Sequence, residues 1–200
     1  DNFILLEDDI WPNHGFIEFL KKSFDILPSS DSVNQISLYS FRFNEFNRLP
    51  FIPYYGHNEN TYIGMQVPSS WGFAAKTEWF QDFVSWQSDK SDEDISRDIR
   101  VPLEVKKWSS NSWKKFFMLF QIEKNKYTLY PAVSFSTILP DNEGFHTKSI
   151  AYDLMTPLGN LGMMNFEKIE DLVLYDSWYE IRPESMGLSA EITSDIYGQK

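Results

Sequence analysis

The chain opens with a short apolar run that ends in three consecutive acids, Glu7, Asp8 and Asp9. The four apolar residues at 3–6 are typical of a strand that is buried on both faces between layers of helices. Charged side chains are costly inside such a layer, so the acids are expected where the strand emerges. In open α/β sheets, ligands bind at the carboxyl ends of the strands. The opening stretch therefore predicts an α/β fold with a ligand site at residues 7–9.

The three acids allow two interpretations. Adjacent carboxylates repel one another unless a cation holds them, and hard divalent cations take oxygen ligands of this kind. Alternatively, the acids form the cap and first turn of a helix, whose N-terminal dipole favours negative charge, with Pro12 just beyond. The pattern alone leaves both interpretations open.

The composition is that of an ordinary folded protein with an acidic balance. The chain has 200 residues, of which 42% are hydrophobic and 17% aromatic, and this length fits one domain. We expect that domain to occupy residues 1–150, and residues 151–200 to form a wrapping tail or a partner surface. The formal net charge of −11 argues against non-specific nucleic-acid binding and against broad attachment to anionic lipid. The absence of cysteine excludes disulfides and thiolate metal sites and is compatible with the cytoplasm. No apolar run reaches the roughly 18 residues of a transmembrane helix, which leaves peripheral contact with a membrane open.

Hydrophobic periodicity places the regular elements. Helices are expected at residues 16–27, at 77–87, after Ser112 and at 165–174, and strands at 35–40 and 127–135. The long irregular stretch 42–62 is typical of a functional or mobile loop. Its tyrosines could stack against a sugar, although core or surface packing is the commoner use of such rings.

Two further segments carry residues suited to a binding site. Small residues follow one indole in Trp71–Ala75, which predicts a close backbone approach to a ligand or a neighbouring strand. The turn at 140–147 places Asp141 close to His146, whose imidazole could bind a metal or could simply lie at the surface.

These segments together resemble a sugar-nucleotide-dependent glycosyltransferase of the GT-A type, over residues 1 to about 150. The acids at 7–9 resemble its Asp-x-Asp motif, and residues 71–79 its small-residue strand and following helix beneath the donor sugar. Trp113 lies 18 positions before Pro131, a spacing similar to that in the N-acetylglucosaminyltransferase that initiates hybrid N-glycans and in its bacterial relatives. Residues 141–146 resemble the Asp-x-x-Gly-x-His loop that closes the bacterial enzymes.

The resemblance implies a GT-A-like mixed sheet flanked by helices, with the N-terminal nucleotide-binding half expected upstream of residue 1. It implies an enzyme in the cytoplasm. If the acceptor is linked to a lipid, the enzyme is expected at the inner face of the membrane. Such an enzyme moves a sugar, with inversion, from a nucleoside diphosphate to a glycan or lipid-linked acceptor, with Mn²⁺ or Mg²⁺ stabilising the departing diphosphate. The implied metal ligands are Asp9 and His146. The implied contacts to the sugar-nucleotide donor are Glu7, Asp8, Trp71, Gly72 and Trp113.

The sequence departs from the family at the catalytic base. An inverting transferase needs a group that accepts the proton of the acceptor hydroxyl, and in the family an Asp follows the Trp that Trp113 matches. Here Lys114 and Lys115 follow instead, and an ammonium cannot accept that proton without a strongly depressed pKa. The candidate bases elsewhere are four carboxylates, Asp92, Asp94, Asp98 and Glu104.

Two other functions compete with the transferase. A transferase-derived module that lost its base would bind a sugar nucleotide or a glycan without turnover, and the two lysines favour this reading. A metal hydrolase using Asp8, Asp9 and His146 is the third hypothesis, and the lack of any further His-rich motif argues against it.

Overall fold

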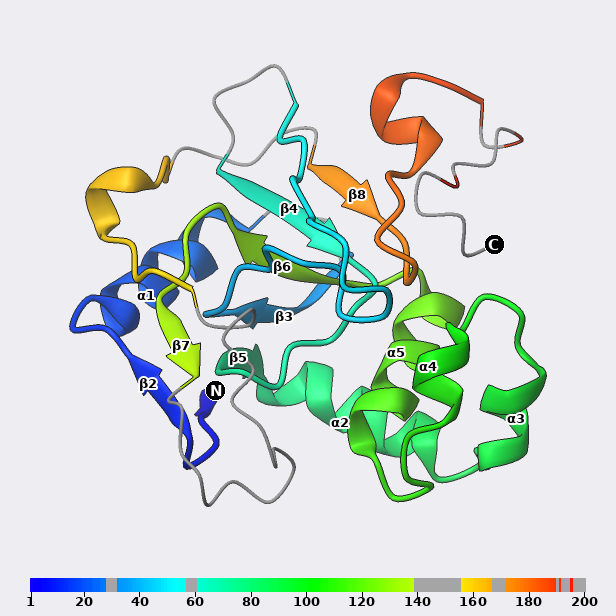
Figure 1. Ribbon diagram of the computed structural model, residues 1–200. Helices are drawn as coiled ribbons and strands as arrows, with labels where there is room; N and C mark the ends of the chain where they lie inside the picture. Colours follow the sequence, from blue (N-terminus) through cyan, green and yellow to red (C-terminus); the bar gives the residue numbers. More distant parts are fainter. Residues whose placement is uncertain are drawn as a thin grey trace.

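The computed structural model describes residues 1–27, 32–56, 61–138, 156–166, 172–189, 191 and 195. Within these ranges, one mixed sheet has the strand order β1-β5-β3-β6-β4-β8 (Figure 1). Its strands are β1 (Asn2–Leu5), β3 (Val33–Ser37), β4 (Tyr62–Met65), β5 (Phe73–Lys76), β6 (Tyr127–Pro131) and β8 (Val173–Tyr175). The pairs β3–β6 and β4–β8 are parallel, and the other neighbours are antiparallel. A separate antiparallel pair joins β2 (Ile10–Pro12) to β7 (Ser136–Ile138).

Helices pack on both faces of this sheet. The helix α1 (Phe16–Ile26) lies on one side, and α2 to α5 gather on the other (Figure 1). The four helices of that group are α2 (Thr77–Gln87), α3 (Asp92–Arg97), α4 (Leu103–Lys106) and α5 (Trp113–Lys124). Two short 3-10 helices, η2 (Leu161–Met163) and η3 (Pro183–Met186), lie in the C-terminal part. The expected α/β class is therefore confirmed.

Alternating side chains of the central strands divide the core into two clusters, one on each face. On β4, Tyr62 joins the cluster that contains Phe19 of α1, whereas its neighbour Ile63 joins the cluster under α2 and α5. On β6, Leu129 and Tyr130 divide in the same way. This period-two alternation in strands covered on both faces makes the sheet the centre of the molecule.

The first strand is not buried on both faces, so that expectation is wrong. Within the described ranges β1 pairs with β5 alone, and its side chains alternate between partial burial and exposure. Phe3 packs edge-to-face on Phe73 and Phe80, while the side chain of Ile4 is 42% exposed. An apolar run predicts a strand, but it does not reveal how many neighbours that strand has.

The C-terminal part corrects a second expectation. Residues 173 and 174, the end of the helix predicted at 165–174, belong instead to the strand β8, which pairs with β4. Other helices and strands were placed to within a few residues, including α1, α2, α5 and β6. No helix within the described ranges combines the length and the apolar character needed to cross a membrane.

Candidate functional site

The three acids lie in the turn that joins β1 to β2. The backbone N–H of Ile10 donates a hydrogen bond to the carbonyl oxygen of Glu7 at 3.2 Å, which closes this turn. The next helix begins only at Phe16, so the interpretation of the acids as a helix N-terminus is wrong. Glu7 and Asp8 are exposed, and Asp9 is half-buried. The acids therefore lie directly after a strand, as expected.

One oxygen of Asp9 is an unusual feature of this turn. Its Oδ1 atom is buried and has no hydrogen-bond partner in the structure. A buried polar atom without a partner costs about 1–3 kcal/mol, and more when it is charged. Six other buried side-chain atoms of the described residues also lack a hydrogen-bond partner, and for a carboxylate oxygen at a strand end coordination of a cation is one explanation. This oxygen fits the role of metal ligand that the resemblance gives to Asp9.

The acid turn packs against the segment that contains Trp71 and Gly72. A Cβ atom at Gly72 would lie 3.1 Å from the side chains of both Leu38 and Leu6, and 3.5 Å from Ile10. Leu6 and Ile10 flank the acids on either side, so the two ends of the turn pack on the glycine. The predicted close backbone approach at residues 71–75 is confirmed by strand pairing: β5 pairs with β1 on one side and β3 on the other, and the N–H of Leu38 donates to the carbonyl of Gly72 at 2.9 Å. Two of the four segments that carry the resemblance are adjacent in space.

Replacing Gly72 by alanine should destabilise the fold more than the same change at Gly187. Both glycines have positive φ, +85° and +70°, so each alanine incurs a backbone penalty of about 1–2 kcal/mol. At Gly72 the new Cβ also crowds two leucine side chains, whereas at Gly187 it meets no atom within 4 Å. Urea denaturation should show a loss of about 2–4 kcal/mol for Gly72→Ala and about 1 kcal/mol for Gly187→Ala. Equal losses would show that the acid turn does not press on Gly72.

A buried glutamine fixes the chain just before Trp71. The side chain of Gln35 on β3 donates to the carbonyl of Ser69 at 3.1 Å and accepts from the Ser69 N–H at 2.8 Å. The hydroxyl of Thr128 on β6 donates to the same glutamine oxygen at 2.8 Å. This network, fully buried, anchors the entry to the Trp71–Gly72 segment on two central strands.

Trp71 also contacts a cation, because Lys114 lies between two indole rings. The ammonium of Lys114 is 5.4 Å from the ring centroid of Trp71 and 5.1 Å from that of Trp108. It also pairs with Glu45, at 3.2 Å from Oε1. The side chains of Lys114 and Glu45 are only 11% and 13% exposed. Lys114, which the resemblance would place at the position of the base, is therefore held in a shielded ion pair.

An open pocket adjoins this ion pair. It has a volume of about 350 Å³ and is lined by Glu45, Phe46, Arg48, Glu104 and Trp108. The sequence indicated only Glu104 among these residues. Glu45, Phe46 and Arg48 lie in the stretch 42–62 that was predicted to be a functional or mobile loop, whereas no sequence signal indicated Trp108. The pocket thus joins that loop to the segment around α4.

The remaining candidate bases are held in structural contacts. Asp98 accepts two hydrogen bonds from the guanidinium of Arg100, and these hold the pKa of Asp98 below its ordinary value. Asp94 accepts from the N–H and the hydroxyl of Ser91 and so completes the capping box of α3. Neither residue lines the pocket.

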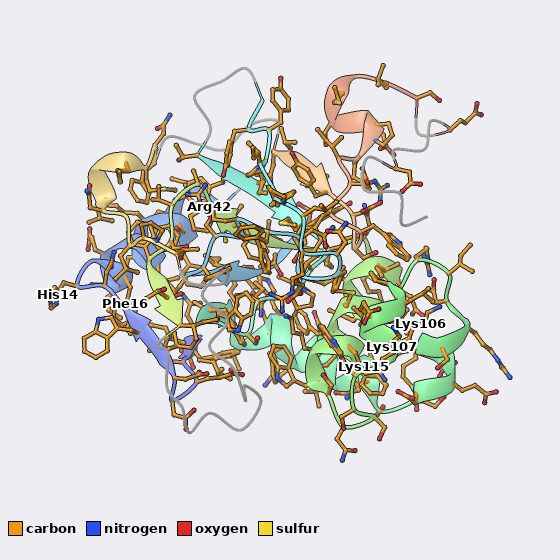
Figure 2. The ribbon with its side chains drawn as sticks, viewed as in Figure 1. His14, Phe16, Arg42, Lys106, Lys107 and Lys115 are labelled. Atoms are coloured by element: carbon orange, nitrogen blue, oxygen red, sulfur yellow. The ribbon has the colours of Figure 1, made fainter. Side chains whose placement is uncertain are left out.

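Asp92 and Lys115 form an ion pair of their own. The Lys115 side chain is fully buried, and its ammonium also donates to the carbonyl of Trp108 at 3.0 Å. Lys115 lies with Lys106 and Lys107 on the helical side of the molecule, opposite His14 (Figure 2). Lys115 therefore ties α5 to α3 and to the segment before Trp113.

Trp113 packs within the aromatic core. Its ring is 5.7 Å from that of Phe73 and 6.0 Å from that of Phe117. Because Phe73 is the residue after Gly72, Trp113 supports the Trp71–Gly72 segment from the side of α5.

The predicted metal ligand His146 and the neighbouring Asp141 lie outside the described residues. The chain leaves the described range at Ile138, which pairs with Ile10, the residue that follows the acids. Within the described part of the chain, no group of three or more potential metal ligands is found.

Comparison with known proteins does not place the chain in a family. No protein-family model matches the sequence, and no curated protein matches it significantly.

Proposed function

We propose that this protein is a metal-dependent glycosyltransferase of the GT-A type. It would move a sugar, with inversion, from a nucleoside diphosphate to a glycan or a lipid-linked acceptor. The observation that carries the proposal is the partnerless buried oxygen of Asp9, in an acid turn that packs on Gly72. A strand end of this kind is where open α/β sheets bind ligands. The proposed compartment is the cytoplasm, including the inner face of the membrane.

Each residue of the turn has a part in the proposal. Asp9 would hold Mn²⁺ or Mg²⁺ together with His146, and the bound cation would supply charge neutralisation for the departing diphosphate. Glu7 and Asp8, both exposed beside Asp9, would accept hydrogen bonds from hydroxyl groups of the ribose and the donor sugar. The backbone at Trp71 and Gly72 would form the floor beneath that sugar.

Metal removal tests this proposal. The purified protein should release nucleoside diphosphate from at least one of UDP-glucose, UDP-N-acetylglucosamine and GDP-mannose in the presence of Mn²⁺. Chelation with EDTA should abolish the release, and an excess of Mn²⁺ should restore it, because the charge of the leaving group is then neutralised again. Turnover that is unchanged by EDTA would contradict the proposal. So would the absence of both turnover and nucleotide binding across the panel.

A second candidate is a module that binds a sugar nucleotide or a glycan without turnover. The ion pair between Lys114 and Glu45 favours it, because the family's base is replaced by a cation that is already neutralised. Mn²⁺-dependent binding of UDP or GDP, measured by calorimetry, with no release from any donor in the presence of methyl glycosides as acceptors, would support the module. Release of diphosphate would exclude it.

A further inference from the structure

We infer that Glu45 accepts the proton of the acceptor hydroxyl, and that the pocket it lines receives the acceptor sugar. The inference rests on the proposed glycosyl transfer and deepens it. It supplies the base that the sequence lacks at position 114.

The first argument is the position of Glu45 relative to the acid turn. The acid turn packs on Gly72, and the preceding residue, Trp71, lies 5.4 Å from the ammonium of Lys114. That ammonium contacts Glu45 at 3.2 Å. The Trp71–Gly72 segment is therefore a common neighbour: the Leu6 and Ile10 side chains that flank the acids contact it at Gly72, and the ion pair of Lys114 with Glu45 adjoins it at Trp71. A base for this reaction must lie on the acceptor side of that floor.

The second argument is the chemistry of the pocket. Trp108 and Phe46 offer aromatic rings, and Glu45, Glu104 and Arg48 offer hydrogen-bonding groups. A pyranose has an apolar C–H face that packs on aromatic rings and a rim of hydroxyl groups that hydrogen-bond to carboxylates and guanidinium groups. The volume of about 350 Å³ falls within the range of small-molecule sites. The pocket therefore fits a sugar.

The third argument is the role left to Lys114. Its ammonium contacts both carboxylate oxygens of Glu45, at 3.2 and 3.4 Å, and is itself held between two indoles. A carboxylate has about four lone-pair positions, so this contact leaves acceptor capacity on Glu45. Lys114 is thus a positioning residue that fixes the orientation of Glu45.

In the proposed reaction, proton transfer and glycosyl transfer occur together. The carboxylate of Glu45 takes the proton of an acceptor hydroxyl, and that oxygen forms a bond to the anomeric carbon of the donor sugar. The bond between the anomeric carbon and the phosphate oxygen breaks at the same time, and its electron pair leaves with the nucleoside diphosphate. The proton is then lost from Glu45 to water.

Replacing Glu45 and Lys114 one at a time distinguishes a catalytic role of the Glu45 carboxylate from a structural role of the ion pair. In transfer from the sugar-nucleotide panel to methyl glycosides, Glu45→Gln should lower kcat by about 100-fold or more. Its affinity for UDP or GDP with Mn²⁺ should stay within about twofold of the wild type. Lys114→Met, which breaks the same pair but keeps the carboxylate, should retain at least about tenfold more turnover than Glu45→Gln. The exposed Glu18→Gln on α1 is the control and should behave as the wild type.

Four outcomes would be decisive. Equal losses in Glu45→Gln and Lys114→Met would show that the pair is only structural and would overturn the inference, as would a kcat for Glu45→Gln within about threefold of the wild type. If Glu45→Gln does not fold, the double variant Glu45→Gln with Lys114→Met removes both shielded charges together, a change that is often close to neutral for stability. The same loss of turnover is then expected in it, and retained turnover would overturn the inference. A wild type that turns over no donor would refute the proposed transferase itself.

Discussion

Replacing Asp9 by asparagine is expected to lower metal-dependent turnover of sugar nucleotides by at least about 100-fold. Asparagine keeps the shape of the side chain but removes the negative charge that would hold the cation. The same change should not lower stability, because it neutralises a carboxylate whose Oδ1 is buried without a partner. When a residue serves function at a cost in stability, its replacement is expected to lower activity without lowering stability. Turnover measured with saturating Mn²⁺ and thermal unfolding without metal would test both parts.

Asp82→Asn is the matched control for this experiment. Asp82 is exposed on α2, and its replacement changes the net charge by the same amount. It should leave both turnover and unfolding unchanged. A normal rate in Asp9→Asn, or a marked loss of its stability, would show that Asp9 serves the fold rather than a cation.

Replacing Phe117 by alanine is expected to lower the free energy of unfolding by about 3–5 kcal/mol. The Phe117 side chain is 2% exposed and lies at the centre of the aromatic cluster between α2 and α5. Its ring centroid is 4.8 Å from that of Phe83 and 5.9 Å from that of Phe120. The loss combines the missing burial of the ring with the cavity that it leaves. For a chain of this length the melting temperature should fall by roughly 6–20 °C.

The control for the core is Ile99→Ala. The side chain of Ile99 is 86% exposed, so its truncation should change the free energy of unfolding by less than about 0.5 kcal/mol. Urea denaturation of the two variants would measure the difference directly. A loss of under about 1 kcal/mol in Phe117→Ala would mean that α2 and α5 do not pack as the structure shows.

Local patterns in the sequence were sufficient for several of the elements, but not for β2, β4 and β7, which no pattern indicated. The apolar spacing in α1, α2 and α5 and the alternation in β6 follow from the periods of helices and strands, which are local properties. The position of β1 at an edge was not predictable in this way, because the number of neighbours of a strand is decided by tertiary pairing. The same holds for β8, whose Val173 and Leu174 fall at the end of the helix predicted at 165–174.

In the candidate site, too, the sequence predicted the residues that belong to local motifs and missed those that only tertiary packing brings together. The acids at 7–9 and the Trp71–Gly72 segment carry local motifs, and the structure brings them into contact. The pairing of Glu45 with Lys114 joins residues that are 69 positions apart, and no local pattern marks Glu45. Long-range packing alone reveals that the lysine at the expected base position has a carboxylate beside it.

A crystal of the protein soaked with Mn²⁺ and UDP would test the central claim most directly, through the anomalous scattering of manganese. The account predicts a manganese peak about 2.1 Å from the carboxylate of Asp9, with the diphosphate on the side of the cation that faces Trp71 and Gly72. Manganese and UDP bound elsewhere on the protein, with Oδ1 of Asp9 still lacking a partner, would contradict it.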